Sequence, residues 1–388
     1  MHTRLRPLYF VSFFQGLIFW YAIEKLFMSH IGFDPSAITT SVIILALVTF
    51  ISEVPAGVLA DRWSRKGTLV LSMAFLTVAA IIFSASNTIP IYLVGVVCFA
   101  VYAAMYSGLI DSIIYDTAVE LDGSGKKFSQ YFGRSKFFTS LAWVIGSLLG
   151  AFIAQKLGLR AAFLASVPSC VLALSAAAAV REPVIHKTFD EQTKLLNHIK
   201  LTFRYISKRE NTLWVVLCIV ATSVPLVFLM EVDQLWPMAL MLPLIWYGPL
   251  NAVLLSGPGI GGVLAHKLQS SAQWLLLGFM GIVSVALLSI PQLSSVVIGQ
   301  FATIAIFTAL NIIATGKLHD SVPSRVRTGV ASAVSTLSTL FALPLLFIFG
   351  VLVNNYSIFV ANYLLIVISV VVFMLYVKLA FLAKRAAE

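Results

Sequence analysis

The sequence predicts an all-α integral membrane protein in which twelve transmembrane helices form two six-helix bundles related by pseudo-two-fold symmetry. Three observations support this prediction: the composition, the spacing of the apolar runs, and the placement of the basic residues. Hydrophobic residues make up 60% of the 388 residues and charged residues only 11%, whereas about a quarter of a soluble domain is charged. A chain with so much apolar surface is expected to be surrounded mainly by lipid.

Twelve apolar runs are each long enough to cross a bilayer, which takes roughly 20 residues in a helix. They cover residues 8–28, 37–60, 68–86, 90–118, 137–157, 160–180, 212–230, 247–265, 272–290, 294–318, 328–353 and 358–382. The predicted domains are an N-terminal bundle (1–181), a cytoplasmic linker with an amphipathic helix (182–210) and a C-terminal bundle (211–388). Two prolines, Pro237 and Pro243, leave 233–246 open between a loop and a broken helix.

Basic residues fix the predicted orientation, because cytoplasmic loops of membrane proteins are enriched in lysine and arginine. With the N-terminus inside, 23 of the 26 basic residues fall on the inner side, and Lys25, Lys156 and Arg160 fall outside. We therefore expect a multi-pass protein of a cell membrane (a bacterial inner or plasma membrane) with both termini in the cytoplasm. The net charge of +10 is explained by this topology, so we expect no nucleic-acid partner.

A short repeat indicates that the two halves arose by duplication. The stretch Gly57-Val58-Leu59-Ala60 closes the second run, and the stretch Gly262-Val263-Leu264-Ala265 closes the eighth, 205 residues later. Both copies are predicted to lie on the inner side. Two six-helix units in parallel orientation are typical of membrane transporters with internal repeats.

The loop between the second and third runs carries the most specific motif of the chain. Residues 57–66 read Gly-Val-Leu-Ala-Asp-Arg-Trp-Ser-Arg-Lys. This stretch resembles the G-x-L-A-D-R-x-G-R-K signature of the major facilitator superfamily, and it departs from that signature only at Ser64, where the family has glycine. Together with the segment count and the repeat, the resemblance extends over essentially the whole chain.

The resemblance implies an inner gate, a set of contacts that closes the cytoplasmic side while the outer side is open. In the family, the aspartate at the position of Asp61 faces the N-terminus of the eleventh segment, here near Thr328. Arg65 lies one helical turn beyond Asp61 and can pair with Asp116 at the inner end of the fourth segment. The alternative is that the basic residues only hold the loop inside. The gate residues implied by the motif are Gly57, Asp61, Arg62, Arg65, Lys66 and Asp116.

Ionisable residues within a membrane segment are functional candidates. The proton-coupling candidates are Asp111 in segment 4, Glu24 in segment 1 and Glu53 in segment 2. Asp111 lies about 7.5 Å deeper than Asp116 and has no basic residue in its own helix, so we expect it to be unpaired and poorly solvated. Glu24 and Lys25 have an alternative role, because both side chains can reach the outer surface.

Two uncharged residues, Gln15 and Asn311, are candidates for contacts with substrate in the cavity, or for hydrogen bonds between helices. The three cysteines lie in apolar runs without metal-ligand spacing. We therefore expect no metal and no cofactor. The sequence has no H-E-x-x-H motif, and His266 and His319 are isolated, so we also expect no enzymatic activity. The expected partners are a small-molecule substrate, protons and the lipid bilayer, and the expected functional state is a monomer.

The predicted function is secondary active transport of a small molecule by alternating access, in the form of proton-coupled export (antiport) of an amphipathic or drug-like compound. Two sequence marks of such exporters are missing: segment 4 contains no arginine, and segment 5 has Gly146-Ser147-Leu148-Leu149-Gly150 in place of a proline-containing glycine motif. Uptake of a small metabolite is therefore an open alternative. A membrane receptor that transports nothing, or a membrane-embedded enzyme, is the alternative of another class.

Overall fold

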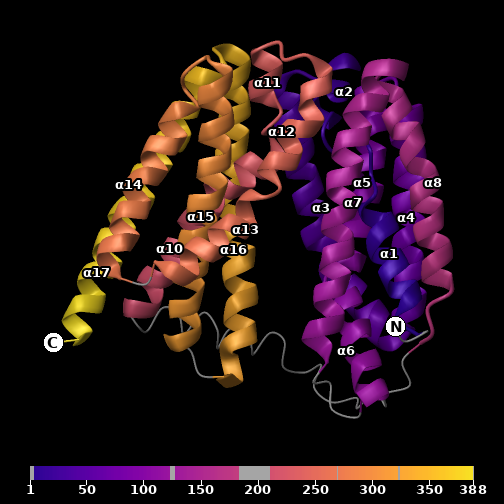
Figure 1. Cartoon of the computed structure of the whole chain (residues 1–388), viewed down its shortest axis with the longest axis horizontal. Helices are drawn as coiled ribbons and strands as arrows, with labels where there is room; N and C mark the ends of the chain where they lie inside the picture. Colours follow the sequence, from indigo (N-terminus) through magenta and orange to yellow (C-terminus); the bar gives the residue numbers. More distant parts are fainter. Residues whose placement is uncertain (1–3, 123–126, 183–209, 269, 322–323, 388) are drawn as a thin grey trace. The chain divides into compact units, whose positions relative to one another are not determined.

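The computed structural model describes residues 4–122, 127–182, 210–268, 270–321 and 324–387, which are helical apart from short connections (Figure 1). These residues form two compact units. Unit 1 comprises the described part of Met1–Phe189 together with Leu242–Ala252, and unit 2 comprises that of Asp190–Met241 and Val253–Glu388. Residues 183–209 of the predicted linker lie outside the described residues, so the amphipathic helix and the predicted domain boundaries stay predictions.

Eight helices of unit 1 come from the first half of the chain as far as it is described. They are α1 (Arg6–Gly16), α2 (Glu24–His30), α3 (Pro35–Arg62), α4 (Arg65–Ala85), α5 (Ile89–Tyr106), α6 (Leu109–Asp122), α7 (Phe128–Leu157) and α8 (Leu159–Ala178). Polar residues mark several helix starts, as expected for side chains that cap free backbone N–H groups. Asp34 Oδ1 accepts from the N–H of Ala37 at 2.7 Å, and Ser64 Oγ accepts from that of Gly67 at 2.8 Å.

The second half of the chain supplies the remaining described helices. They are α10 (Glu210–Glu231), α11 (Leu235–Ala239), the 3-10 turn η2 (Leu244–Trp246), α12 (Tyr247–Leu254), α13 (Gly257–Lys267), α14 (Ser271–Leu287), α15 (Leu293–Ser321), α16 (Ser324–Asn355) and α17 (Ile358–Ala387). The ambiguous stretch 233–246 is thus a broken helix around Pro237 and Pro243. The end of this stretch and the first part of α12 form Leu242–Ala252, which belongs to unit 1. Here η2 packs on α7, and Ser147 Oγ donates to Asn251 Oδ1 of α12 at 2.8 Å.

Ten helical spans in the described residues are long and apolar enough to cross a membrane. Two more predicted segments are present as shorter helices: the ninth as α14, which has 17 residues, and the first as α1 and α2. All twelve predicted segments therefore have a helical counterpart. The seventh predicted segment, for example, runs from 212 to 230 and corresponds to α10.

The first segment was predicted as one helix from 8 to 28, and this prediction is wrong, because the helix is interrupted at Leu17–Ile23. Non-helical backbone at membrane depth needs partners within the protein. The N–H of Phe19 donates to Ser166 Oγ at 2.9 Å. Gly150 of α7 leaves room for this backbone, since a Cβ there would lie 1.8 Å from the Phe19 carbonyl oxygen.

The fourth segment is also interrupted, between α5 and α6 at Ser107 and Gly108. Gly108 has a φ of +70°, a conformation that residues with a Cβ rarely adopt. The break ends α5 and starts a new helix, with Asp111 in the first turn of α6. The eighth segment is divided in the same way into α12 and α13, ahead of Pro258.

The repeat lies at the ends of two helices. Gly57 and Gly262, the first residues of the two repeat copies, each lie five residues before the last residue of α3 and α13, respectively. In contrast, α7 begins at Phe128, nine residues before the predicted start of segment 5 at Phe137. Polar residues such as Gln130 and Arg134 extend the helix beyond its apolar part.

Each unit has its own aromatic core. In unit 1, the Trp20 and Phe163 rings are stacked with centroids 5.2 Å apart, and the Phe83 and Tyr92 centroids are 4.6 Å apart. In unit 2, the Phe228 and Phe349 centroids are 5.1 Å apart. The close packing of such large rings contributes van der Waals contacts between the helices of each unit.

Candidate functional site

Several ion pairs and hydrogen bonds gather at the motif end of unit 1, the end where α3 stops at Arg62 and α4 begins at Arg65. Here the guanidinium of Arg65 forms an ion pair with the carboxylate of Asp116 on α6. The side chains of Arg65 and Asp116 are 26% and 15% exposed, respectively. This contact is the pair expected from the motif, and it joins two helices of the same unit. A second pair, Arg4 with Glu120 at 2.5 Å, ties the start of the chain to the same helix.

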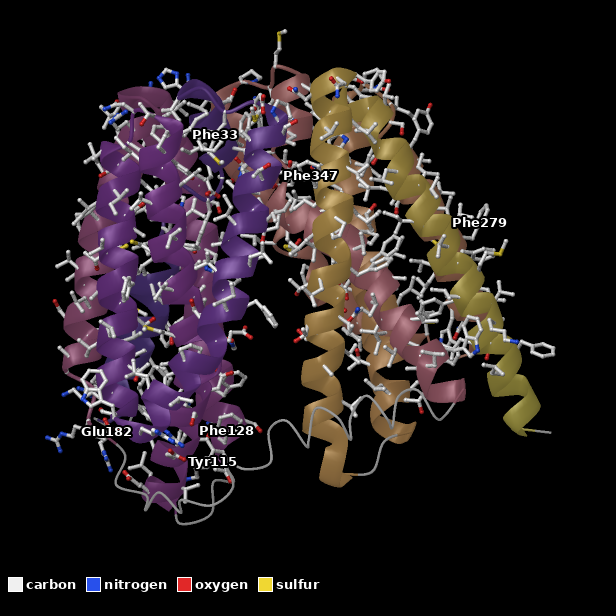
Figure 2. The ribbon with its side chains drawn as sticks, turned by 180° about the vertical axis from the view of Figure 1, so that it is seen from behind. Phe33, Tyr115, Phe128, Glu182, Phe279 and Phe347 are labelled. Atoms are coloured by element: carbon white, nitrogen blue, oxygen red, sulfur yellow. The ribbon has the colours of Figure 1, made fainter. Side chains whose placement is uncertain are left out.

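The N-terminus of α4 is held by Glu182, a residue that the sequence analysis did not single out. Glu182 Oε1 accepts from the N–H of Arg65 at 2.9 Å. Its Oε2 accepts from the N–H of Lys66 at 2.9 Å and from Ser64 Oγ at 2.6 Å. A carboxylate at this position neutralises free backbone donors and the positive end of the helix dipole. Figure 2 shows Glu182, Tyr115 and Phe128 at one end of unit 1 and Phe33 at the other.

The remaining motif residues take different positions. Gly57 lies on an open side of α3, where a Cβ would meet nothing within 4 Å. Arg62 is exposed, and Lys66 is half-buried in the first turn of α4. The side chains of Asp61 and of the residues around Thr328 lie outside the described part of the structure, so the expected contact between Asp61 and segment 11 stays a prediction.

Asp111, the first proton-coupling candidate, has a basic neighbour. Its Oδ1 lies 4.0 Å from Nζ of Lys136 on α7, and the two side chains are 39% and 60% exposed, respectively. The expectation that Asp111 is unpaired and poorly solvated is therefore wrong. The reason is that a residue on another helix supplies the positive charge, which the composition of its own helix cannot reveal.

Glu24 lies at the opposite end of unit 1 in a network of its own. Its Oε2 accepts from Lys25 Nζ at 3.0 Å, and its Oε1 accepts from the Tyr92 hydroxyl at 2.8 Å. The Lys25 side chain is 7% exposed and that of Glu24 is 23% exposed. Lys25 thus does not extend to the outer surface as the alternative reading required, and Glu24 is tied to α5.

The other three candidates do not converge on Asp111. Glu53 lies exposed on α3. Gln15 is buried on α1, where its Oε1 accepts from the Tyr102 hydroxyl at 2.7 Å. Asn311 on α15 donates to Thr222 Oγ1 at 3.0 Å and to Ser223 Oγ at 3.1 Å on α10. Gln15 and Asn311 therefore act as hydrogen-bonding links between helices in this structure, and a contact with substrate stays a prediction.

Among the described residues, no group of three or more histidine, cysteine, aspartate or glutamate side chains is placed to hold a metal ion. The ionisable side chains that are brought together form pairs. Such pairs can close a helix interface or exchange a proton.

Comparison with known proteins decides the family. The sequence profile of the Major Facilitator Superfamily matches residues 7–343, which is most of the chain. The chain belongs to the major facilitator superfamily. As a member, it has the twelve-helix, two-bundle fold of a transporter and is a multi-pass membrane protein rather than an enzyme.

Solved structures of other superfamily members share this fold at low sequence identity. The nucleoside transporter NupG has a TM-score of 0.77 and 13% identity, covering 97% of this chain and 99% of that one. A bacterial homologue of the human lysosomal transporter Spinster, in an inward-facing and unoccupied conformation, has a TM-score of 0.71 and 16% identity over 98% and 96% of the two chains. A D-xylose-proton symporter has a TM-score of 0.71 and 13% identity over 96% and 97%.

A curated relative matches a smaller part of the chain than these structures do. An uncharacterized MFS-type transporter of Schizosaccharomyces pombe is 27% identical over 141 residues, which span 35% of this chain and 30% of the yeast protein.

Proposed function

We propose that this protein is a secondary active transporter that moves a small molecule by alternating access and couples export of an amphipathic or drug-like compound to protons. The observation that carries the proposal is Asp111, a carboxylate within a membrane span whose Oδ1 lies 4.0 Å from its Lys136 partner. Its place within a span, beside a cation that another helix supplies, supports a role in coupling. Family membership supports transport, and the D-xylose-proton symporter among the structural neighbours supports proton coupling within this fold.

The inner gate of the proposal consists of Arg65 and Asp116, with Gly57, Asp61, Arg62 and Lys66 of the same motif. The ion pair between Arg65 and Asp116 supports this assignment, because it joins α4 to α6 at the motif end. Both side chains are mostly buried, so the pair is less screened than an exposed one. The alternative, in which the motif only fixes topology, needs no such pair.

Asp111 is the preferred proton carrier over Glu24 and Glu53. Both carboxylate oxygens of Glu24 are already engaged within unit 1, since they accept hydrogen bonds from Lys25 and Tyr92. Glu53 lies exposed on α3. Asp111 has one loosely placed cation and is partly accessible, as a group that exchanges protons must be.

The proposal also includes the oligomeric state, the membrane and the orientation of the protein. The protein works as a monomer in a cell membrane, with both termini in the cytoplasm and with bundles at 1–181 and 211–388. The basic residues support this orientation. Uptake of a metabolite is the second form of the function, and the nucleoside transporter and the D-xylose-proton symporter among the structural neighbours favour testing it.

The test is flux into proteoliposomes of known protein orientation. A ligand is first found by thermal stabilisation of the purified protein, since a compound that binds the native state raises its apparent stability. An imposed proton gradient should then drive that compound uphill, and the sign of the gradient gives the direction. Binding without any flux would favour a receptor and contradict the proposal.

A further inference from the structure

The last helix, α17, has a lysine inside its membrane span. The apolar span covers Ile358–Leu382, and the helix is continuous through it. Lys378 follows Ile358 by 20 residues (378 − 358), a rise of about 30 Å in an α-helix. The hydrocarbon core of a bilayer is also about 30 Å thick, so Lys378 is level with the lipid headgroups at the C-terminal end of α17. A charge at that depth is costly unless another group neutralises it.

The neighbours of Lys378 are aromatic. Its Nζ lies 5.6 Å from the ring centroid of Trp214 and 6.0 Å from that of Phe381. Trp214 is near the start of α10, which packs on α17 and begins at the end of unit 2 where α17 finishes (Figure 1). Among the side chains that the structure describes, no carboxylate oxygen lies within 4.0 Å of Nζ. Aromatic faces attract an ammonium group, but they are not strong acceptors for its three N–H donors.

An exposed apolar stripe on α17 leads to this lysine. Val367, Val371 and Met374 precede Lys378 at helical spacing, and all three are exposed. From Val367 to Lys378 the helix rises about 16 Å, which is close to half the thickness of the hydrocarbon core. The surface is therefore apolar over the depth of one leaflet and cationic at the level of its headgroups.

We infer that this surface of α17 and α10 binds an anionic phospholipid, with the phosphate of the headgroup on Lys378 and an acyl chain along Val367, Val371 and Met374. The phosphate oxygens accept hydrogen bonds from the ammonium group, which the aromatic rings do not. An anionic headgroup such as phosphatidylglycerol places a net negative charge beside Lys378. A zwitterionic headgroup such as phosphatidylcholine has a cation of its own that offsets this attraction. The inference depends neither on the transported compound nor on Asp111.

A lysine near the end of a span has a simpler alternative role. Its ammonium group can extend to water along its own apolar stem, so that it only marks the membrane boundary. Such a lysine would not distinguish one phospholipid from another. Its removal would then change lipid binding no more than the removal of another lysine at a helix end. Lys267, which is exposed at the end of α13, supplies that comparison.

The first measurement is lipid binding to the purified full-length protein in a neutral detergent, followed by native mass spectrometry. Phosphatidylglycerol should bind about fivefold more tightly than phosphatidylcholine with the same acyl chains, the factor that one lysine at an anionic membrane surface contributes. Lys378→Gln should abolish this preference, whereas Lys378→Arg and Lys267→Gln should keep it. Equal binding of the two lipids to wild type overturns the inference, as does a preference that survives in Lys378→Gln.

Two further arms separate the lipid from other ligands and locate it. Excess inorganic phosphate should not displace phosphatidylglycerol, and displacement would assign the site to a free anion. In vesicles of phosphatidylcholine, a phosphatidylglycerol probe with a photoreactive diazirine in its acyl chain should label residues 367–374 of α17 more than Leu276 and Phe279. These two residues are exposed on α14, which has no charged residue. Equal labelling of the two helices in wild type overturns the inference, and this comparison needs no folded variant.

Discussion

The guanidinium of Arg65, in the first turn of α4, pairs with the carboxylate of Asp116 on α6, and both side chains are mostly buried. Glu182 holds the N-terminus of the same helix through the backbone of Arg65 and Lys66. These contacts make the motif end of unit 1 one connected body. If the motif forms a gate, this body is the part of unit 1 that has to move as a whole.

Asp116→Asn removes the charge of the Arg65 partner without changing its shape. We expect it to shift the equilibrium between conformations by about 1 kcal/mol, or roughly fivefold, because the pair is partly screened. Spin labels at Gln130→Cys and Gly316→Cys, two exposed positions in units 1 and 2, report this shift as a change in the distance distribution.

Two comparisons control that experiment. The exchanged pair Arg65→Asp with Asp116→Arg should restore part of the wild-type distribution, and Asp61→Asn should shift it in the same direction as Asp116→Asn. A distribution that stays unchanged in Asp116→Asn leaves the motif with a topological role only.

Glu182→Ala should lower the free energy of unfolding by about 1–2 kcal/mol, because three donors at the start of α4 lose their charged acceptor. Thermal unfolding of the purified protein measures this. Ser64→Ala is the matched variant, since it removes one of these bonds and the Ser64 cap of Gly67 while leaving the carboxylate in place. Equal stability of Glu182→Ala and wild type would show that water replaces the carboxylate without cost.

Gly150→Ala should destabilise the protein by about 3 kcal/mol, because the new Cβ would lie 1.8 Å from the carbonyl oxygen of Phe19 and the backbone would have to shift. Gly133→Ala on the same helix is the control. A Cβ at Gly133 meets nothing within 4 Å, and alanine favours helix more than glycine, so its stability should stay equal or rise. Similar melting temperatures for the two variants would mean that the interruption of the first segment is not packed against α7.

Cysteine accessibility tests the orientation. In a background that lacks Cys98, Cys170 and Cys218, an impermeant thiol reagent added to intact cells should react with Ser294→Cys and Asn354→Cys, both of which are exposed. It should miss Ser207→Cys in the predicted cytoplasmic linker. Strong labelling of Ser207→Cys from outside would contradict the predicted orientation.

The number and position of the spans were readable from the sequence because each span is an apolar run long enough to cross a bilayer, as for segment 6 and α8 (Leu159–Ala178). The interruption of the first segment at residues 17–23 was not readable from the sequence. Its residues are as apolar as those of a continuous span, and its partners, Ser166 and Gly150, are far away in the chain. Gly108 was a possible sign of the break before α6, yet a glycine in a helical pattern alone does not establish one.

Some contacts of the candidate site were also predictable from the sequence, and others were not. The pairing of Arg65 with Asp116 followed from a motif with fixed spacing. Lys136 stood at the edge of a predicted segment and counted only as a topological charge, while Glu182 was an acid in a mostly basic loop. Which acid meets which cation depends on how α6 lies against α7 and how α8 ends near α4, and neither relation is encoded in local sequence.

Asp111 is the group that couples transport to protons in the proposed function, so its role is the one to measure most directly. The direct measurement is substrate-driven proton movement in proteoliposomes that contain a pH dye, with the compound found by thermal stabilisation. Wild-type protein should move protons when a substrate gradient is applied. Asp111→Asn should not, although it should still exchange labelled for unlabelled substrate, and Glu24→Gln should behave like wild type. Proton movement that persists in Asp111→Asn would contradict the account.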